Sequence, residues 1–260
     1  MPYYPILKAP SSEGWTTLSN FPPNNWEIGG GQEKFVNVTW ASDGFWHTKN
    51  LGLLGFGKFR MFSYIDIASI VPKDAFPFLS MSSVRLPELS EHLPDLSDHT
   101  TNLPIWRSTL GLSTSNASVS FQGEINPFHS PGSLLTFCPF IQSIETTENY
   151  LLFINLENSA VTKTSELKFF NSRTNKLKLT VKVENNNLTV VALNSLSFKS
   201  HDLPLIICPE MSGIPLFYSK TSDGRFLSLE HTHPPASFVV HGKRWEAQKV
   251  LKEKWLSRLI

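Results

Sequence analysis

The stretch that decides the fold is Ser165–Leu193, SELKFFNSRTNKLKLTVKVENNNLTVVAL. Apolar side chains recur there at every second position, which is the spacing that places them on one face of a β-strand. Asparagines occupy both joints, and asparagine tolerates the positive φ that tight hairpin turns require. The stretch therefore predicts three strands of an antiparallel meander, whose apolar members are Leu167 and Phe169, then Leu177, Leu179, Val181 and Val183, then Leu188 and Val190.

The same alternation continues on both sides of this stretch. On the C-terminal side, Ile214–His233 predicts a hairpin with Asp223 and Gly224 in its turn. On the N-terminal side, further strands are expected in KFVNVTW, FRMFSYIDI, ASVSFQ, SLLTFC and YLLFINLE, which begin at Lys34, Phe59, Ala117, Ser133 and Tyr150. Many short strands with one persuasive helix predict a mainly β fold, either an antiparallel β-sandwich or two associated β-lobes, with one C-terminal α-helix.

A repeated phrase marks the expected domain boundary. Leu86–His99, LPELSEHLPDLSDH, repeats the pattern Leu-Pro-acid-Leu-Ser-acid-His, and its prolines exclude a continuous helix. A metal site formed by His92 and His99 is one interpretation, but a solvated connector anchored by Leu89 and Leu96 is the expected one. The predicted organisation is an N-terminal lobe rich in Trp and Gly at 1–85, an acidic connector with prolines at 86–104, and a main antiparallel domain with the C-terminal helix at 105–260.

Composition excludes some partners. The net charge of +1 provides no overall positive field of the kind that drives nucleic-acid binding, so nucleic acid is not expected. No signal-peptide pattern begins the chain, and no segment reaches the roughly 20 apolar residues of a transmembrane helix. We expect a soluble, cytoplasmic protein in which Cys138 and Cys208 are buried free thiols, with a disulfide between them as the alternative.

The histidines near the C-terminus are the candidate metal ligands. His231 and His233 are two residues apart in a predicted strand, so their side chains project from the same face and can chelate one ion. A complete site needs a further ligand, for which His241, Glu124 and His129 are the donors of suitable type. The cofactor would be a divalent transition metal, namely zinc, iron or manganese. The alternative is a structural histidine pair at the end of a strand.

A polar loop is the candidate ligand site. Gln122, Glu124, Asn126 and His129 fall between two predicted strands, beside phenylalanines. Amides and carboxylates can bind sugar hydroxyls while an aromatic ring covers the apolar face of a sugar. The alternative is an ordinary hairpin loop. Four tryptophans could likewise form a stacking platform or pack inside the lobe, and these are Trp15, Trp26, Trp40 and Trp46.

The C-terminal helix carries a basic surface. Residues 243–258 contain six basic and two acidic side chains. The apolar residues that share one side of the predicted helix are Ala247, Val250, Leu251, Trp255 and Leu259. We expect this helix to dock on the sheet with its basic side in solvent. The alternative is that it binds a protein partner or a membrane surface.

Nucleotide and hydrolase motifs are missing from the sequence. The glycines fit neither the phosphate-binding loop nor the dinucleotide fingerprint, and no serine lies in a nucleophile elbow. The predicted function is a recognition or accessory protein that binds a polar ligand, a carbohydrate or other small molecule, through loops at the rim of a β-sandwich. One alternative is a metal-dependent enzyme with a centre at His231, His233 and His241. A second alternative is a subunit of a larger protein assembly.

Overall fold

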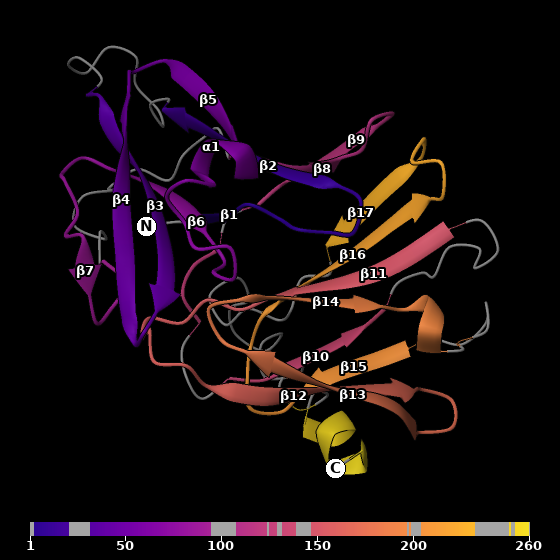
Figure 1. Cartoon of the computed structure of the whole chain (residues 1–260). Coiled ribbons are helices and arrows are strands. Elements are labelled where there is room, and N and C mark those ends of the chain that lie inside the picture. The colour runs from indigo at the N-terminus through magenta and orange to yellow at the C-terminus, as the bar shows by residue number, and fades with distance from the viewer. Residues whose placement is uncertain are drawn as a thin grey trace. The chain divides into compact units, whose positions relative to one another are not determined.

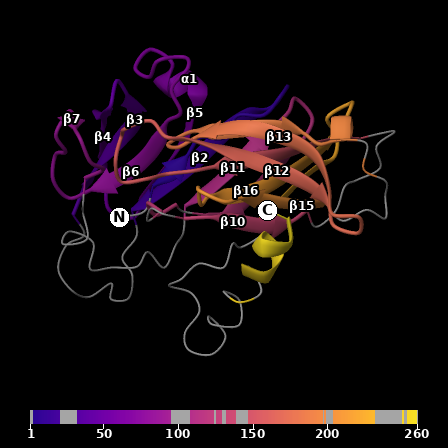
Figure 2. The same ribbon diagram turned by 90° about the horizontal axis from the view of Figure 1, so that it is seen from below.

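The structure is a computed structural model of the chain, and strands dominate it (Figures 1 and 2). It describes residues 3–20, 32–94, 108–123, 125–128, 132–138, 147–196, 198, 204–231, 250 and 253–259. The predicted mainly β fold with a short C-terminal helix is confirmed. Among the described residues, no helix combines the length and the apolar character that a membrane crossing requires.

The chain divides into two compact units. The first comprises Met1–Pro127, Leu156–Thr162 and Asn186–Leu188, and the second comprises Phe128–Asn155, Lys163–Asn185 and Thr189–Ile260. These ranges differ from the domains 1–85, 86–104 and 105–260, which stay a sequence-based prediction.

The first unit contains two antiparallel sheets and a short helix, α1 (Tyr64–Ile67). Both sheets contribute to one hydrophobic core, which includes Leu18, Val38, Phe62 and Leu79. The five-stranded sheet has the order β1 (Tyr4–Pro5), β6 (Phe78–Ser82), β3 (Lys34–Ser42), β4 (Phe45–Leu54) and β7 (Leu89–Ser90). The four-stranded sheet has the order β5 (Lys58–Ser63), β2 (Glu13–Asn20), β8 (Thr109–Ser113) and β9 (Ser118–Gln122).

The second unit also contains two four-stranded sheets, which lie one above the other in Figure 1. A single core draws Leu167 and Ile206 from one sheet and Leu151 and Phe217 from the other. A 3-10 turn, η2 (Asn194–Leu196), follows the edge strand at Leu188–Ala192. The first sheet has the order β10 (Leu134–Phe137), β15 (Pro204–Cys208), β12 (Thr164–Asn171) and β13 (Lys176–Glu184). The second has the order β14 (Leu188–Ala192), β11 (Thr147–Ile154), β16 (Ile214–Thr221) and β17 (Leu227–His231).

The stretch 165–193 forms the three predicted strands, but they do not form one meander. Strands β12 and β13 pair with each other, whereas β14 lies in the sheet of β11. Asn175 and Asn186 supply the positive φ at the two joints, as the sequence indicates. In β14 the core receives Val191, while Val190 is exposed. The strand therefore presents the face opposite to the predicted one, because a shift of one residue exchanges the two faces.

Two other expectations from the sequence are confirmed. The hairpin of β16 and β17 turns at Gly224, whose φ is +66°. Cys138 and Cys208 are both buried thiols that form no disulfide, so the alternative of a disulfide is wrong. The Cys208 thiol lies 3.3 Å from the Ser165 hydroxyl, and burial raises its pKa, which keeps it protonated and unreactive.

The first copy of the repeated phrase, Leu86–His92, contains β7, an edge strand of the first unit. Strand β7 pairs with β4, and the Lys49 ammonium lies 2.9 Å from the Glu88 carboxylate. The prediction that Leu89 anchors this segment is wrong, because Leu89 is 52% exposed. Leu93 is the buried leucine instead. Strand β7 has a neighbouring strand on one side only, so fewer side chains are available to cover Leu89. The second half, with Leu96 and His99, lies outside the described residues.

The C-terminal helix, described over residues 253–259, docks on a sheet of the second unit as expected. Trp255, Leu256 and Leu259 pack against Phe170, Leu205 and Ile207. The Trp255 ring also meets the Phe137 ring edge-on, with 5.6 Å between centroids. Lys254 and Arg258 are exposed, whereas Val250, which was expected on the apolar side, is 47% exposed. A protein partner at the exposed side of this helix stays a prediction.

Candidate ligand-binding face

Strand β2 positions two side chains of the candidate site. Its side chains alternate strictly between buried and accessible positions. Thr16 and Leu18 point inward and are fully buried, so Trp15 and Thr17 point outward. The inward hydroxyl of Thr16 is satisfied by a 2.6 Å hydrogen bond to the Pro5 carbonyl. The polar sequence of β2 therefore forms a stable strand despite its few apolar residues.

The outward side chains of the β5-β2-β8-β9 sheet form one continuous surface, which we call the Trp15 face. Its register follows from three ladders, of β2 with β5, β2 with β8 and β8 with β9. Most of its members carry a hydroxyl or an amide. They are Phe59, Met61 and Ser63 on β5, Glu13, Trp15, Thr17 and Ser19 on β2, Thr109, Gly111 and Ser113 on β8, and Ser118, Ser120 and Gln122 on β9.

The indole of Trp15 has a fixed position on this face. Its Nε1 donates a 2.9 Å hydrogen bond to Ser113 Oγ on the neighbouring strand. A Cβ atom added to Gly111 would lie only 2.5 Å from Trp15 Cζ2 and 2.4 Å from the Val119 carbonyl oxygen. The ring therefore occupies the space that a side chain at Gly111 would fill. The indole is also partly exposed, so an aromatic surface is held in place before any ligand arrives.

The hydroxyls around Trp15 are also ordered. Ser113 Oγ lies 2.8 Å from Ser118 Oγ, which extends the chain of contacts from Trp15 to β9. The Thr17 hydroxyl donates to the Thr109 carbonyl and accepts from the Thr109 amide, at 3.1 Å in each case. The side chain of Thr17 is thus fixed between β2 and β8, and the surface is preorganised on both sides of the indole.

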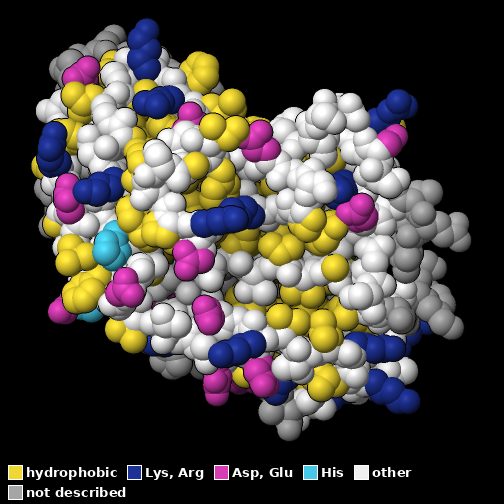
Figure 3. Space-filling model, in the orientation of Figure 1, with side chains coloured by type: hydrophobic (Ala, Val, Ile, Leu, Met, Phe, Trp, Pro, Cys, Tyr) yellow, Lys and Arg dark blue, Asp and Glu magenta, His cyan; other side chains and the backbone are white. Residues whose placement is uncertain are grey.

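The edge of the Trp15 face on β5 is apolar. Phe59 is 70% exposed and Met61 is 58% exposed, which is unusual for side chains of this size. Hydrophobic side chains reach the surface where Figure 1 places β5 (Figure 3). The basic residues Lys58 and Arg60 alternate with them and point to the other side of the strand. The surface therefore changes from apolar at β5 to polar at β9.

The structure describes two of the four residues of the predicted loop site, Gln122 and Asn126. Gln122 is the last residue of β9 and belongs to the Trp15 face, and its side chain is exposed. Asn126 is exposed as well, after the bridge of Ile125 with Tyr3. Glu124 and His129 lie outside the described residues.

The four tryptophans have different environments. Trp46 is fully buried and donates its Nε1 to the Asn158 carbonyl, and Trp40 is 6% exposed and stacks on His47. Both are therefore core residues, which agrees with the alternative interpretation that these tryptophans pack inside the lobe. Trp15 is the platform candidate, and Trp26 lies outside the described residues. Sequence reasoning did not find β2, and the Glu-Gly-Trp-Thr-Thr-Leu-Ser-Asn alternation would have been the signal.

The predicted metal ligands are described only through the backbone of His231. That residue ends β17 and pairs with Leu216, which agrees with the predicted strand. The side chain of His231 and the residues His233 and His241 lie outside the described part of the chain. Within the described part, no group of three or more His, Cys, Asp or Glu side chains could hold a metal ion.

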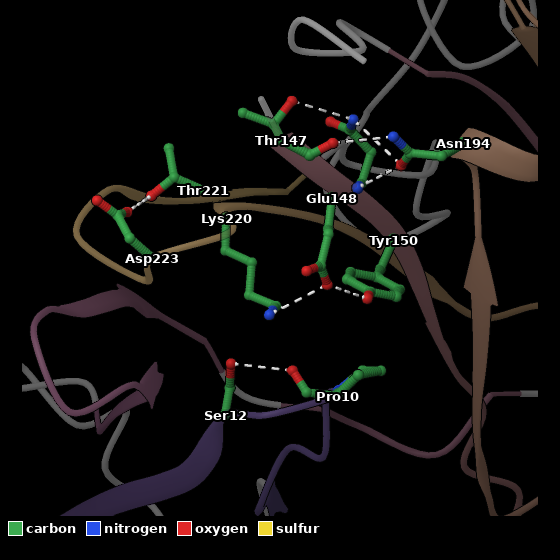
Figure 4. A network of polar contacts seen from close by, with 10 residues as sticks. Pro10, Ser12, Thr147, Glu148, Tyr150, Asn194, Lys220, Thr221 and Asp223 are labelled. Atoms are coloured by element: carbon green, nitrogen blue, oxygen red, sulfur yellow. Dashed lines mark hydrogen bonds and ion pairs between the residues drawn. The ribbon is translucent and has the colours of Figure 1, made fainter. Parts of the chain in front are cut away.

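A second ordered polar group lies in the second unit, on β11 and β16 (Figure 4). Glu148 Oε2 accepts a 2.5 Å hydrogen bond from the Tyr150 hydroxyl and lies 3.1 Å from Lys220 Nζ. These hydrogen bonds, with that from Tyr150 the larger effect, lower the pKa of Glu148. Burial and the bond to Glu148 raise the pKa of Tyr150 to about 12. A phenol of that pKa stays protonated at neutral pH, so Tyr150 acts as a hydrogen-bond donor to Glu148.

Comparison of the chain with protein-family models, with curated protein sequences and with solved structures found no significant match, so the Trp15 face is assigned from its own chemistry alone.

Proposed function

We propose that this chain is a recognition or accessory protein that binds a polar ligand, specifically a carbohydrate, without catalysing a reaction on it. The observation that carries the proposal is the fixed, partly exposed indole of Trp15 among the hydroxyl and amide groups of an open sheet surface.

This combination of groups suits a sugar. A pyranose ring has an apolar side made of C–H groups and a rim of hydroxyls that both donate and accept hydrogen bonds. An indole covers the apolar side and contributes a large contact area at a small entropic cost, since few torsions need to be fixed. Ser120 and Gln122 are exposed on the same face of the sheet and provide donors and acceptors. A ligand therefore meets both kinds of surface at once.

Loops at the rim of the sheet extend the proposed site. Gln122 closes β9, and Asn126, whose side chain is exposed, follows it. Glu124 and His129 stay in the proposal as ligand contacts from the same loop. In this proposal the two sheets of the first unit act as a sandwich-like scaffold, because a rigid scaffold fixes the positions of loop residues.

Glycan binding by Trp15→Ala tests the proposal. The wild-type chain is expected to bind members of a glycan array, and isothermal titration of the best glycan should show at least a tenfold weaker affinity for Trp15→Ala. Phe226→Ala is the matched control, since Phe226 is an aromatic residue that is 76% exposed in the β16–β17 turn. Its affinity is expected to equal that of the wild type.

Two results would contradict this function. The first is a wild-type chain, folded by circular dichroism, that binds no glycan on the array. The second is turnover of the bound glycan to a product, because the proposed protein binds its ligand and leaves it unchanged.

A further inference from the structure

Four side chains line up across the Trp15 face. Met61 on β5 is paired with Thr17 on β2, and Thr109 on β8 is paired with Gln122 on β9. The hydrogen bonds between Thr17 and Thr109 join the two pairs into one row. Adjacent strands are about 4.8 Å apart, so the row spans about 14 Å, the length of roughly three pyranose rings.

A second row runs parallel to the first. It consists of Ser63, Trp15, Gly111 and Ser120, again one residue from each strand. Residues two apart on a strand are separated by about 7 Å, so the second row borders a chain that follows the first. The Trp15 indole covers Gly111 in this row, and its Nε1 reaches Ser113 in the row beyond. It therefore lies beside the middle strands, where the central ring of such a chain would be.

Neither row contains a charged side chain. Glu13 is the single charged member of the Trp15 face as defined by the described residues, and it lies in a further row with Ser113 and Ser118. Lys58 and Arg60 are on β5 but point to the other side of the sheet. An anionic sugar would therefore lose hydration without gaining a cationic partner, which is unfavourable. A neutral sugar loses no charge solvation and finds hydroxyl and amide partners.

We infer that the Trp15 face binds a neutral, extended oligosaccharide that crosses the strands from Met61 to Gln122, with Trp15 against its central rings. This inference rests on the proposed carbohydrate function and adds the class, length and direction of the ligand. The apolar side of one terminal ring covers Met61 and Phe59, and hydroxyls of the other terminal ring bind the Gln122 amide. A single sugar contacts one of these ends at most, so affinity rises with chain length.

The test uses the full-length chain on an array of neutral, uronic-acid and sulfated oligosaccharides of one to six units. We expect neutral chains of three or more units to bind at least tenfold more tightly than their monosaccharides. Met61→Ala and Gln122→Ala are each expected to weaken the longer chains about fivefold to tenfold and to change monosaccharide binding little. Phe226→Ala is again the matched control, with unchanged affinities.

The possible failures separate the inference from the function beneath it. A wild-type chain that binds no glycan overturns the proposed function. Glycan binding that prefers acidic chains, that is as tight for monosaccharides, or that survives both Met61→Ala and Gln122→Ala overturns the inference and leaves the function standing. Loss of binding in Trp15→Ala alone, with the other two variants unchanged, also overturns the inference, because the chain then does not cross the sheet.

Discussion

The ammonium of Lys220 lies 3.1 Å from the carboxylate of Glu148, and the two ends of this ion pair have unequal access to water. The Lys220 side chain is 6% exposed, whereas that of Glu148 is 42% exposed. A buried charge depends on its partner more than an exposed one does, because water cannot replace the lost interaction. The pair is therefore expected to respond differently to loss of either member.

The first prediction concerns this asymmetry. Glu148→Gln is expected to destabilise the protein by about 1–3 kcal/mol, since it leaves a buried ammonium without a counterion. Lys220→Met is expected to cost less, because the remaining carboxylate is solvated and the methionine fills the same space. Urea denaturation of both variants measures the difference. Equal losses, or a larger loss for Lys220→Met, would show that the pair does not have this asymmetry.

The second prediction is the pH dependence of the same group. The pKa of Glu148 is lowered in the folded state, so in acid the unfolded state binds more protons than the folded state. The stability from this carboxylate is fully present above its ordinary pKa of 4.5 and is lost as the pH falls through the folded value. For Tyr150 the folded pKa is raised from 10.0 to about 12, so stability declines as the pH rises across that interval.

Melting temperatures of the wild type and Glu148→Gln across the pH range check both directions. We expect the difference between them to be constant near neutral pH and to shrink as the pH falls below 4.5. A difference that persists unchanged into strong acid would mean that Glu148 ionisation does not contribute to folding.

The third prediction concerns Gly111, which lies beneath the Trp15 ring. Gly111→Ala places a Cβ 2.4 Å from the Val119 carbonyl and 2.5 Å from Trp15 Cζ2, so the ring or the strand must move. We expect a loss of about 1–3 kcal/mol in stability together with a change in indole fluorescence. Gly55→Ala is the control, since its Cβ would meet only Lys58 Cγ, at an ordinary 3.5 Å. If both variants behave like the wild type, the position of Trp15 over Gly111 is incorrect.

The fourth prediction concerns the C-terminal helix. Trp255→Ala removes the ring that packs on Phe137 and on the cluster of Phe170, Leu205 and Ile207. Since the ring is only partly buried, the expected loss is about 1–3 kcal/mol. The substitution is also expected to increase protease cleavage near the helix. Lys254→Ala, at an exposed position of the same helix, should leave both properties unchanged; parallel losses in the two variants would rule out docking through Trp255.

The sequence predicts strands well where alternation is carried by strongly apolar residues, as in β12 with Leu167 and Phe169. It does not predict which sheet a strand joins, because that depends on long-range pairing. The transfer of β14 to the sheet of β11 is such a case. Its asparagines indicate a turn, and the turn alone does not specify the partner strand.

The Trp15 face was less accessible to prediction, for a physical reason. The inward side chains of β2 include Thr16 and Asn20, whose polar groups are satisfied by the carbonyls of Pro5 and Leu54. The usual contrast between apolar and polar positions is therefore weak in this strand. Gln122 was identified from its residue type, whereas its alignment with Thr109 and Met61 requires the register of three ladders.

The order in which the chain supplies its parts has a consequence for synthesis. Leu156–Thr162 and Asn186–Leu188 belong to the first unit, although the chain reaches them after building strands of the second. Trp46 Nε1 and the Leu93 amide both donate to the carbonyl of Asn158, and Asn186 in turn binds Glu157 and Ser159. The N-terminal half thus cannot complete its hydrogen bonding while it emerges from the ribosome. These hydrogen bonds form only after residue 188 has been translated, when strands β10 to β13 of the second unit have already been synthesised.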